Sequence, residues 1–421
     1  MSEIEKLENI QIHEVRVAKK IVRGAKNSYG PIYPNVEKYN HLMQFQEGDK
    51  LSAQQPKADN SNDLETIDIP LFWCGRSPEH YGAFIAKHIS RIIVYKDFEI
   101  KGKLCFSVRP NQGANVKSWF WKILDHFGYS KEDVFFVDKP IIAKTLYVTP
   151  QNEMIYQKSN TSENYLNLLD KNYPPKPLSE KKGIVYISRS KLPTTNCLLG
   201  EDYLEFYFKK CGIKIVHPEQ ISIIEQLEIY NSARCIIMLE GSAYHTFQLF
   251  GRALGDVIII ARRTTTKKSD HGEHWCQSFI EPRCNSLTFY SGYNEDGVEN
   301  YLKKINQKKK TISKSGGAPR IYNYTKMMKE IMNVVKSIDE SILDVEISKS
   351  EYTKFMQNDY IKFLKNEAEI INRLEKKEIV QEVKNINKSM PNFKMWEFKS
   401  MEYDDYIKFI KSEVNKINNV S

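Results

Sequence analysis

The chain has 421 residues, and its 62 Lys and Arg against 53 Asp and Glu give a formal net charge of +9. With 41% apolar and 12% aromatic residues it can bury sizeable cores, which excludes a wholly disordered protein. No apolar run approaches the roughly 18–20 residues of a membrane span, and residues 1–20 lack the apolar stretch of a secretory signal, so we expect a cytoplasmic protein of two or three domains.

In the N-terminal half, strand patterns and helix patterns alternate. Residues 46–62 are polar and predict an exposed loop, whereas residues 67–74 predict a buried strand. Residues 79–93 carry apolar side chains at helical spacing and predict a helix that begins just after Pro78. Further on we expect a strand at 103–108, a helix at 116–127 and a strand at 133–137. This alternation predicts an α/β arrangement around a parallel sheet.

Residues 171–182 are polar and rich in proline, and they predict a domain boundary. Beyond them the alternation is cleaner. We expect strands at 183–188, 213–217, 235–239 and 257–261 and helices at 202–211, 222–233 and 241–254. This order predicts a doubly wound sheet, in which ligands bind at the carboxyl ends of the strands.

From about Lys303 the sequence becomes rich in Lys, Glu and Asn and predicts long helices. Residues 359–365 (Asp-Tyr-Ile-Lys-Phe-Leu-Lys) recur as residues 405–411 (Asp-Tyr-Ile-Lys-Phe-Ile-Lys), 46 positions later. Two copies are too few for a solenoid, so we expect a helical hairpin that docks on the core or mediates self-association. The predicted domains are therefore 1–175, 176–310 and 311–421.

Positive charge is densest among the lysines of residues 303–310, where no aromatic side chain is interleaved. Proteins that bind single-stranded nucleic acid combine a basic groove with stacking aromatics, so we expect no nucleic-acid partner. A solvated linker is the simpler interpretation. A surface for acidic lipid headgroups, as in peripheral membrane contact, or for an acidic polysaccharide stays open.

Two polar groups follow predicted strands of the C-terminal half. Ser188 and Arg189 end one strand, and an arginine there offers a rigid fork of donors suited to phosphate, although most surface arginines are only solvated. His217, Pro218 and Glu219 follow the next strand and could hold a base or a ribose; a lone histidine at such a place is more often structural.

A third group lies where residues 239–245 pass from strand to helix. Gly241 permits close backbone approach, Ser242 suits a helix N-cap, and the N–H groups at the helix start attract anions. His245 lies one turn further on. Simple helix capping is the alternative interpretation.

The fourth group is Glu79 and His80 at the start of a predicted helix, with His88 two turns on. Both are candidate general bases, and the alternative is helix capping by Glu79 with a solvent-facing His80.

Several chemistries lack support in the sequence. Neither a phosphate-binding P-loop nor a dinucleotide fingerprint nor a nucleophile elbow occurs, and no Asp-x-Asp follows a strand. His271 and His274 have metal-like spacing but no recognisable third ligand, so we predict no metal site. The seven cysteines form no Cys-x-x-Cys pair, which favours reduced thiols.

In this order the motifs resemble those of glycosyltransferase family 61, also called DUF563. The stretch 183–263 is similar through Ile187-Ser188-Arg189, Val216-His217-Pro218-Glu219, Glu225-Gln226 and Gly241-Ser242-Ala243-Tyr244-His245. Residues 80–84 and Arg91 resemble the family's Asn-Tyr-Gly-His-Phe helix, with His80 and Ala83 in place of Asn and His. Glu240 stands where many members have His. The resemblance covers roughly residues 71–263.

The resemblance implies a GT-B architecture of two Rossmann-like domains facing across a cleft, here with an α-helical C-terminal extension. It implies inversion at the anomeric carbon, no cofactor or metal, and a nucleotide-sugar donor, which we expect to be UDP-linked. Arg189 and the helix start would bind the diphosphate, His217, Pro218 and Glu225 the nucleoside, and Glu79 or His80 would be the catalytic base. The implied nucleotide-sugar site comprises Ser188, Arg189, His217, Pro218, Glu219, Glu225, Glu240, Gly241, Ser242, Ala243 and His245.

The sequence thus predicts a bacterial cytoplasmic glycosyltransferase that acts on a capsule-type surface polysaccharide or a lipid-linked glycan, at the inner face of the membrane. Two alternatives stay open. One is a polysaccharide-modifying transferase of another class, such as a pyruvyl transferase, and the other is a non-catalytic scaffold with a degenerate cleft. Self-association through the helical extension also stays open.

Overall fold

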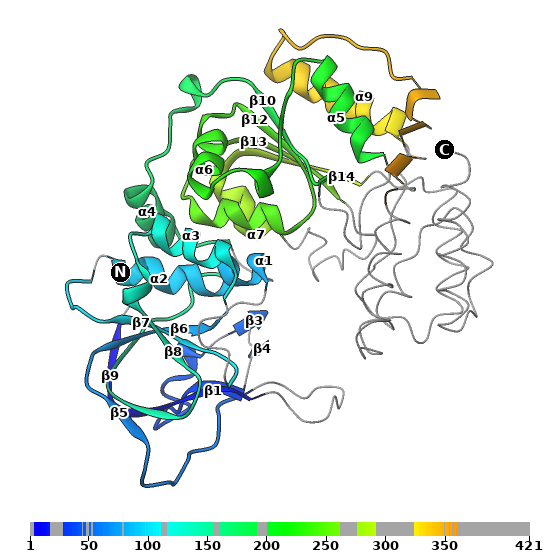
Figure 1. The fold of residues 1–421 in the computed structure, drawn as a ribbon. Helices are drawn as coiled ribbons and strands as arrows, with labels where there is room; N and C mark the ends of the chain where they lie inside the picture. Colours follow the sequence, from blue (N-terminus) through cyan, green and yellow to red (C-terminus); the bar gives the residue numbers. More distant parts are fainter. Residues whose placement is uncertain are drawn as a thin grey trace, which may run out of the picture.

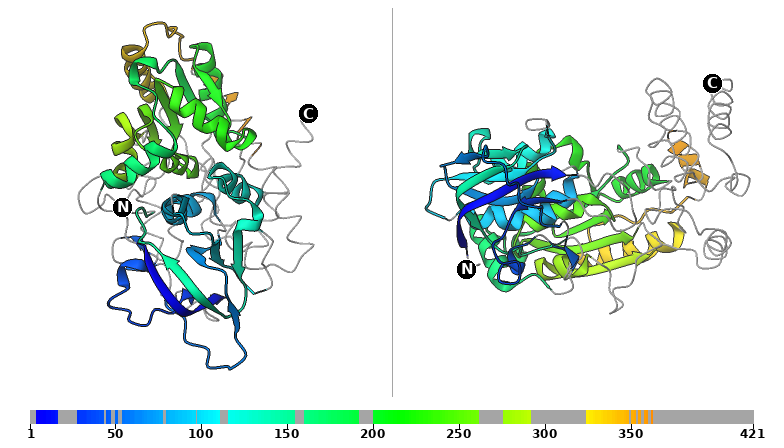
Figure 2. Two further views of the ribbon diagram at one scale, coloured as in Figure 1. Left: turned by 90° about the vertical axis from the view of Figure 1, so that its left-hand side faces the viewer. Right: turned by 90° about the horizontal axis from the view of Figure 1, so that it is seen from below.

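The computed structural model describes residues 4–16, 28–43, 45–47, 50–51, 54–77, 80–96, 98–110, 116–154, 160–191, 200–261, 276–291, 324–348, 350–352, 354–355, 358–359 and 362. Within this part of the chain the fold is mixed α/β and contains two large sheets, with helices between and around them (Figures 1 and 2).

The N-terminal sheet has seven strands in the order β2-β1-β9-β6-β7-β8, with β5 also paired to β9. Its strands are β1 (Glu5–Arg16), β2 (Ser28–Pro31), β5 (Glu65–Ile67), β6 (Leu71–Arg76), β7 (Lys103–Ser107), β8 (Val134–Val137) and β9 (Ile141–Val148). β5, β6, β7, β8 and β9 run parallel to one another, but β1 is antiparallel to both of its neighbours, β2 and β9. The predicted parallel sheet is therefore only part of a mixed one.

Three details of this half differ from the prediction. The strand expected at 67–74 is two strands, β5 and β6. The loop expected at 46–62 contains a short antiparallel pair, β3 (Phe45–Glu47) and β4 (Lys50–Leu51), after the turn η1 (Asn40–Leu42). The helix expected at 79–93 has three parts, α1 (Tyr81–Phe84), the π-helical η2 (Ile85–Ile89) and α2 (Ser90–Lys96).

The helices of this half lie between the two sheets (Figures 1 and 2). α3 (Ser118–His126) matches the helix predicted at 116–127 and is followed by the turn η3 (Lys131–Asp133). α4 (Glu163–Asn172) and the turn η4 (Leu178–Glu180) then lead along the predicted boundary at 171–182 into the C-terminal sheet.

The C-terminal sheet has five parallel strands in the order β11-β10-β12-β13-β14. They are β10 (Ile184–Ile187), β11 (Lys214–Val216), β12 (Cys235–Leu239), β13 (Leu254–Ala261) and β14 (Cys284–Ser291). Numbered along the chain, this is the doubly wound order 2-1-3-4-5, whose direction reverses between β10 and β12. The predicted strands are confirmed here, because central parallel strands are continuously apolar and are bounded by turn residues.

Helices cover both faces of this sheet. α5 (Glu201–Lys210) and α9 (Tyr324–Ile338) pack on one face, where Phe208, Met328 and Ile331 join Tyr186 and Ile237 in a buried core. The other face is covered by α6 (Ile223–Ser232), η6 (Ser242–Leu249) and α7 (Gln277–Ile280). α9 lies in the predicted extension, residues 311–421, so the beginning of that extension packs on one face of the C-terminal sheet.

One hydrophobic core joins the two sheets. Phe72 of β6 and Phe84 and Phe120 of the intervening helices belong to the same buried cluster as Tyr230 of α6 and Phe247 of η6. A second N-terminal core lies around β1, β2 and β9 and contains Ile12, Trp73 and Leu146. Because apolar contact continues from one sheet to the other, the described halves are packed together over a shared surface.

Two further findings concern the whole described part of the chain. None of its helices is both long and apolar enough to span a membrane. None of the six described cysteines forms a disulfide, and five of them are buried: Cys74, Cys105, Cys211, Cys235 and Cys276.

Candidate functional site

The strand order places two sequence motifs together at the reversal point of the C-terminal sheet. Ser188 and Arg189 follow β10, and Gly241 follows the adjacent β12. A Cβ added to Gly241 would lie 2.0 Å from Nη1 of Arg189, so the guanidinium covers the glycine backbone. The backbone of Gly241 is extended, with φ 174° and ψ 179°, which any residue can adopt. Glycine is therefore favoured at position 241 because a side chain there would collide with the Arg189 guanidinium, and not because of the backbone conformation.

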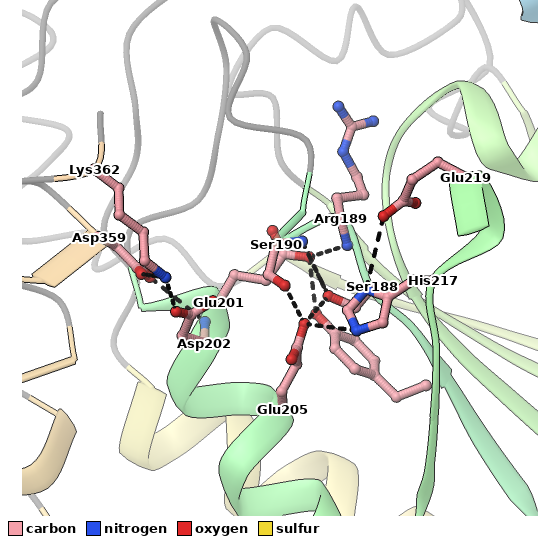
Figure 3. A network of polar contacts seen from close by, with 11 residues as sticks. Ser188, Arg189, Ser190, Glu201, Asp202, Glu205, His217, Glu219, Asp359 and Lys362 are labelled. Carbon is pink, nitrogen blue, oxygen red and sulfur yellow. Dashed lines mark hydrogen bonds and ion pairs between the residues drawn. The ribbon is translucent and has the colours of Figure 1, made fainter. Parts of the chain in front are cut away.

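The turn that carries Arg189 is held by the first turn of α5 (Figure 3). Glu201 Oε1 accepts a hydrogen bond from the backbone N–H of Arg189, at 2.5 Å, and lies 3.1 Å from Ser188 Oγ. Glu205 Oε1 accepts from the hydroxyls of Ser188 and Ser190. Two carboxylates thus fix the backbone of residues 188–190, and neither binds the guanidinium.

The Arg189 guanidinium is directed away from these carboxylates (Figure 3). Within the described part of the chain it makes no hydrogen bond or ion pair. Its five N–H donors and its charge therefore remain available to an anion at the carboxyl edge of the sheet.

Glu201 itself is buried, with only 3% of its surface exposed. Burial raises the pKa of Glu201 to about 7, while the Arg189 N–H and its side-chain charge act in the opposite direction. Glu205 lies 3.7 Å from Nε2 of His217, and Nδ1 of His217 lies 3.8 Å from Glu219. The His-Pro-Glu motif is therefore part of the same polar network as Ser188 and Arg189.

The sequence after β11 is fixed from α6. Pro218 begins the turn η5 (Pro218–Gln220), and its carbonyl accepts a hydrogen bond of 2.8 Å from Nε2 of Gln226. Glu225 forms a capping box with Ser222, in which each side chain accepts from the other's backbone N–H. The described hydrogen bonds of Glu225, which the resemblance implies to be part of the nucleoside site, thus serve the start of α6.

The segment after β12 differs from the predicted helix. Glu240 is fully buried, and η6 is a 3-10 helix of eight residues that ends at Leu249, whereas an α-helix was expected to residue 254. Just beyond its end, Gly251 packs on Asp170 of α4, where a Cβ would lie 1.9 Å from Oδ1. Gly241 occupies the N-cap, so the prediction of Ser242 as N-cap is wrong. Ser242 and Ala243 begin the helix, whose first N–H groups have no partner within it.

α1 of the N-terminal half docks on η6 of the C-terminal half through three successive residues. Nε2 of His80 lies 3.3 Å from Ser242 Oγ, and the Tyr81 hydroxyl lies 2.7 Å from Thr246 Oγ1. A Cβ on Gly82 would lie 2.3 Å from Cδ2 of His245. The two motifs therefore form one contact between segments about 160 residues apart in the chain.

The contacts of His80 bear on which of its ring nitrogens carries a proton. Nδ1 of His80 accepts a long hydrogen bond, 3.4 Å, from the backbone N–H of Ala83, which makes His80 the N-cap of α1. A neutral imidazole whose Nδ1 accepts a hydrogen bond carries its proton on Nε2. Nε2, the ring atom that would carry the proton of a neutral His80, faces Ser242.

His245 begins a buried chain of polar contacts. Its Nδ1 lies 2.7 Å from Gln248 Oε1, the Gln248 amide donates to Glu153, and Glu153 pairs with Arg283 at 2.7 Å. Because the Gln248 amide nitrogen is used by Glu153, its oxygen must accept from Nδ1–H of His245. The His245 ring also stacks on Phe279, with centroids 5.5 Å apart. We call His245, Gln248, Glu153 and Arg283 the buried relay.

The sequence model of the family described as Glycosyltransferase 61 matches residues 81–251. This span begins on α1 and ends just beyond η6, so it contains both partners of the α1–η6 contact and the turn of Arg189. Residues 81–251 belong to glycosyltransferase family 61. A comparison with curated proteins finds no significant match. Membership in the family implies glycosyltransferase activity.

The match lies within the range of the resemblance, residues 71–263, and the structure brings most of the predicted site residues together. Glu79, the other candidate base, lies outside the described residues, as do His271 and His274. Among the described residues no group of three or more His, Cys, Asp or Glu side chains could hold a metal ion.

His88 and Arg91 of the family 61 segment are buried in the N-terminal half. Nδ1 of His88 lies 2.7 Å from the Cys74 carbonyl, and burial lowers the pKa of His88 to about 3, so it is neutral at physiological pH. The Arg91 guanidinium donates to the carbonyls of Leu42, Met43 and Thr149. The arginine that ends the family's helix motif therefore ties two segments, residues 42–43 and Thr149, to α2.

Sequence reasoning missed several residues that hold the candidate site in place. Glu201 and Glu205 lie on α5, whose sequence has the pattern of an ordinary amphipathic helix. Glu153, Gln248 and Arg283 come from three segments that are far apart in the sequence. One local signal is Gln248, which with His245 and Thr246 is a polar residue inside the buried run from Tyr244 to Leu249. A buried amide requires partners, but it does not say which.

Proposed function

We propose that the chain is an inverting, metal-independent glycosyltransferase of GT-B architecture. It transfers a sugar from a nucleotide-sugar donor, which we expect to be UDP-linked, to a surface polysaccharide or a lipid-linked glycan on the cytoplasmic side of a membrane. The observation that carries this proposal is the Arg189 guanidinium, which lies over Gly241 at the reversal point of the C-terminal sheet with no hydrogen bond or ion pair in the described part of the chain.

The GT-B assignment is supported by the α1–η6 contact. α1 follows the carboxyl end of β6, and η6 follows the carboxyl end of β12. β6 and β12 each pair with parallel neighbours in their own sheet. The contact between α1 and η6 therefore supports an arrangement in which the carboxyl edges of the two sheets, where ligands bind in such folds, face each other. A donor bound at one edge and an acceptor bound at the other would then meet near His80 and Ser242, which lie 3.3 Å apart.

On the donor side, Arg189 and the first N–H groups of η6 would bind the diphosphate. Developing negative charge on the leaving nucleoside diphosphate would be stabilised by these fixed donors. The network of His217 and Glu219 lies beside Arg189 and would hold the nucleoside. Pro218 would contribute by fixing the turn.

On the acceptor side, the transfer needs a base for the acceptor hydroxyl. The hydroxyl oxygen would attack the anomeric carbon from the face opposite the diphosphate, the bond between that carbon and the diphosphate oxygen would break, and the hydroxyl proton would pass to the base. Glu79 or His80 would fill this role. His80 could take the proton at Nδ1 once its long hydrogen bond to Ala83 opens.

The first test is a titration of UDP, GDP, CMP and TDP into the wild-type protein and Arg189→Ala, by calorimetry and by thermal unfolding. A nucleotide at about 100 times its Kd should raise the stability of the wild type by about 2.7 kcal/mol, and Arg189→Ala should lose this response. The variant should fold normally, because the Arg189 side chain makes no hydrogen bond or ion pair with the described residues.

A matched control removes a cation elsewhere. Lys144→Ala breaks an exposed ion pair of 3.0 Å with Asp68 and should keep the full nucleotide response. If no nucleotide stabilises the wild type, or if Arg189→Ala responds as well as Lys144→Ala, the proposed donor site is wrong. Transfer from the sugar conjugate of the bound nucleotide, assayed in Glu79→Gln and His80→Asn, then identifies the base.

A further inference from the structure

A strap from the C-terminal region runs along α5. The strap consists of the described residues between 343 and 362. The N–H of Leu343 donates to the Cys211 carbonyl at 3.2 Å, and the Tyr207 hydroxyl donates to the Val345 carbonyl at 3.1 Å. The strap therefore begins at the C-terminal end of α5 and runs antiparallel to the helix.

The middle of the strap is aromatic. Phe355 packs on Tyr203 and Phe206, with ring centroids 5.8 and 5.2 Å apart, and Tyr352 meets Tyr203 edge to face at 5.6 Å. The N–H of Ser348 also donates to the Tyr203 hydroxyl. These contacts bring the strap as far as the first turn of α5 and bury apolar surface on the way.

The strap reaches the helix N-terminus at Asp359. Oδ2 of Asp359 accepts from the N–H of Gly200, at 2.9 Å, and lies 3.5 Å from the N–H of Asp202. Lys362 forms an ion pair with Asp202 (Figure 3). Gly200 is at the N-cap position but has no side chain. The Asp359 carboxylate, from a distant segment, is therefore a side-chain acceptor for N–H groups at the start of α5.

Glu201 lies between the two residues that Asp359 contacts. It is also the residue whose carboxylate holds the Arg189 N–H and Ser188 Oγ. Freedom in the first turn of α5 would therefore be transmitted to the turn of residues 188–190. We propose that Asp359 is a positioning residue for the Arg189 turn, acting through the first turn of α5 and Glu201. Its consequence for donor binding rests on the proposed function.

The sequence offers a matched control. Asp359 and Lys362 are the Asp and Lys of the first copy of the internal repeat, and Asp405 and Lys408 hold the same places in the second copy, which lies outside the described residues. Tyr207→Phe gives a second control, because it removes a hydrogen bond at the opposite end of the strap. It should lower stability about as much as the loss of a cap, without touching the first turn of α5.

The deciding experiment is amide hydrogen exchange of the full chain without nucleotide, followed by mass spectrometry of peptides that cover residues 186–191. Asp359→Ala should speed exchange of this turn about fivefold, the change expected from losing one N-cap. Asp359→Asn should stay close to wild type, because asparagine caps as well as aspartate. Tyr207→Phe and Asp405→Ala should leave this peptide unchanged.

Calorimetry with UDP then measures the consequence. Asp359→Ala should raise the Kd for UDP about three- to fivefold, and the two controls should bind as the wild type does. Unchanged exchange in Asp359→Ala, or an equal change in either control, would overturn the proposal. If the wild type binds no UDP, that counts against the proposed function, while the exchange data alone decide whether Asp359 positions the turn.

Discussion

Replacing Arg283 by methionine tests the energetics of the buried relay. Arg283 and Glu153 are 1% and 2% exposed, and their charged groups are 2.7 Å apart. Arg283 also donates to the carbonyls of Phe250 and Phe279 and to the hydroxyl of Thr161. Methionine fills much of the arginine's volume but supplies no donor. The variant would therefore leave the Glu153 carboxylate buried without its counter-charge.

The cost of that uncompensated charge has an upper limit, because Glu153 can bind a proton instead. Burial already raises the pKa of Glu153, and Arg283 is the main influence that lowers it, so removing Arg283 raises this pKa further. Protonating a carboxyl of ordinary pKa 4.5 at pH 7 costs about 3.4 kcal/mol at 1.36 kcal/mol per pH unit. We therefore expect Arg283→Met to lose about 3 kcal/mol through Glu153, near the lower end of the range for broken buried pairs.

The pH dependence isolates this contribution. A carboxyl with a raised pKa in the folded state stabilises the fold below its unfolded pKa, and this stability is lost as pH rises through the folded pKa. Urea unfolding of Arg283→Met and of the double variant Arg283→Met/Glu153→Gln should differ by about 3 kcal/mol at pH 7 and by little near pH 4.5. Lys144→Met, which removes an exposed pair, should change stability by less than about 1 kcal/mol at either pH. Equal stability of the single and double variants at pH 7 would refute the reasoning.

Three other substitutions test the donor edge and the contact between the halves. Gly241→Ala should leave the unfolding midpoint unchanged, because its Cβ meets only the flexible end of Arg189, but should weaken UDP binding about tenfold in calorimetry as the guanidinium is displaced. Because the pKa of Glu201 is raised in the folded state, the wild type should lose up to about 3 kcal/mol of unfolding free energy between pH 4.5 and pH 7. Glu201→Gln should abolish this loss in urea unfolding. A wild type that shows no such loss contradicts the prediction. Tyr81→Phe should lower the free energy of unfolding by about 1–3 kcal/mol, because the buried Thr246 hydroxyl loses its partner, and adding Thr246→Val should restore part of it.

The sequence predicts the C-terminal sheet well, because central parallel strands such as β12 are short apolar runs bounded by turn residues. Once the strand order is inferred, the carboxyl-end positions of Arg189 and Gly241 follow from topology. β1 is different. Its buried residues Leu7, Ile10 and Ile12 do not alternate regularly, and Asn9 has a left-handed backbone with φ 55°. Its pairing with β9 is decided by tertiary packing, which local patterns do not encode.

The candidate site shows the same division. Residues at the carboxyl edge of the C-terminal sheet, such as Arg189 and His217, follow strands directly or within two residues and can be found from that position. Residues that orient them cannot be found in this way, because Glu201 acts through its own tertiary contacts and Asp359 reaches the start of α5 from about 160 residues away. The repeat in the C-terminal region is visible in the sequence, yet its partner on α5 is set only by the folded chain.

The π-helical segment η2 controls the rotational phase between the two ends of one helix. A π-helix contains one more residue than the α-helix from which it derives, and one residue corresponds to about 100° of rotation in an α-helix. Gly82, before η2, faces His245 of the C-terminal half, whereas Arg91, after it, reaches carbonyls of the N-terminal half. Deleting a single residue within Ile85–Ile89 would turn these two faces relative to each other by about that angle. The contact of Gly82 with His245 and the hydrogen bonds of Arg91 could not then form at the same time. Insertions and deletions of single residues should therefore destabilise the protein more in this helix than in a helix that contacts only one half.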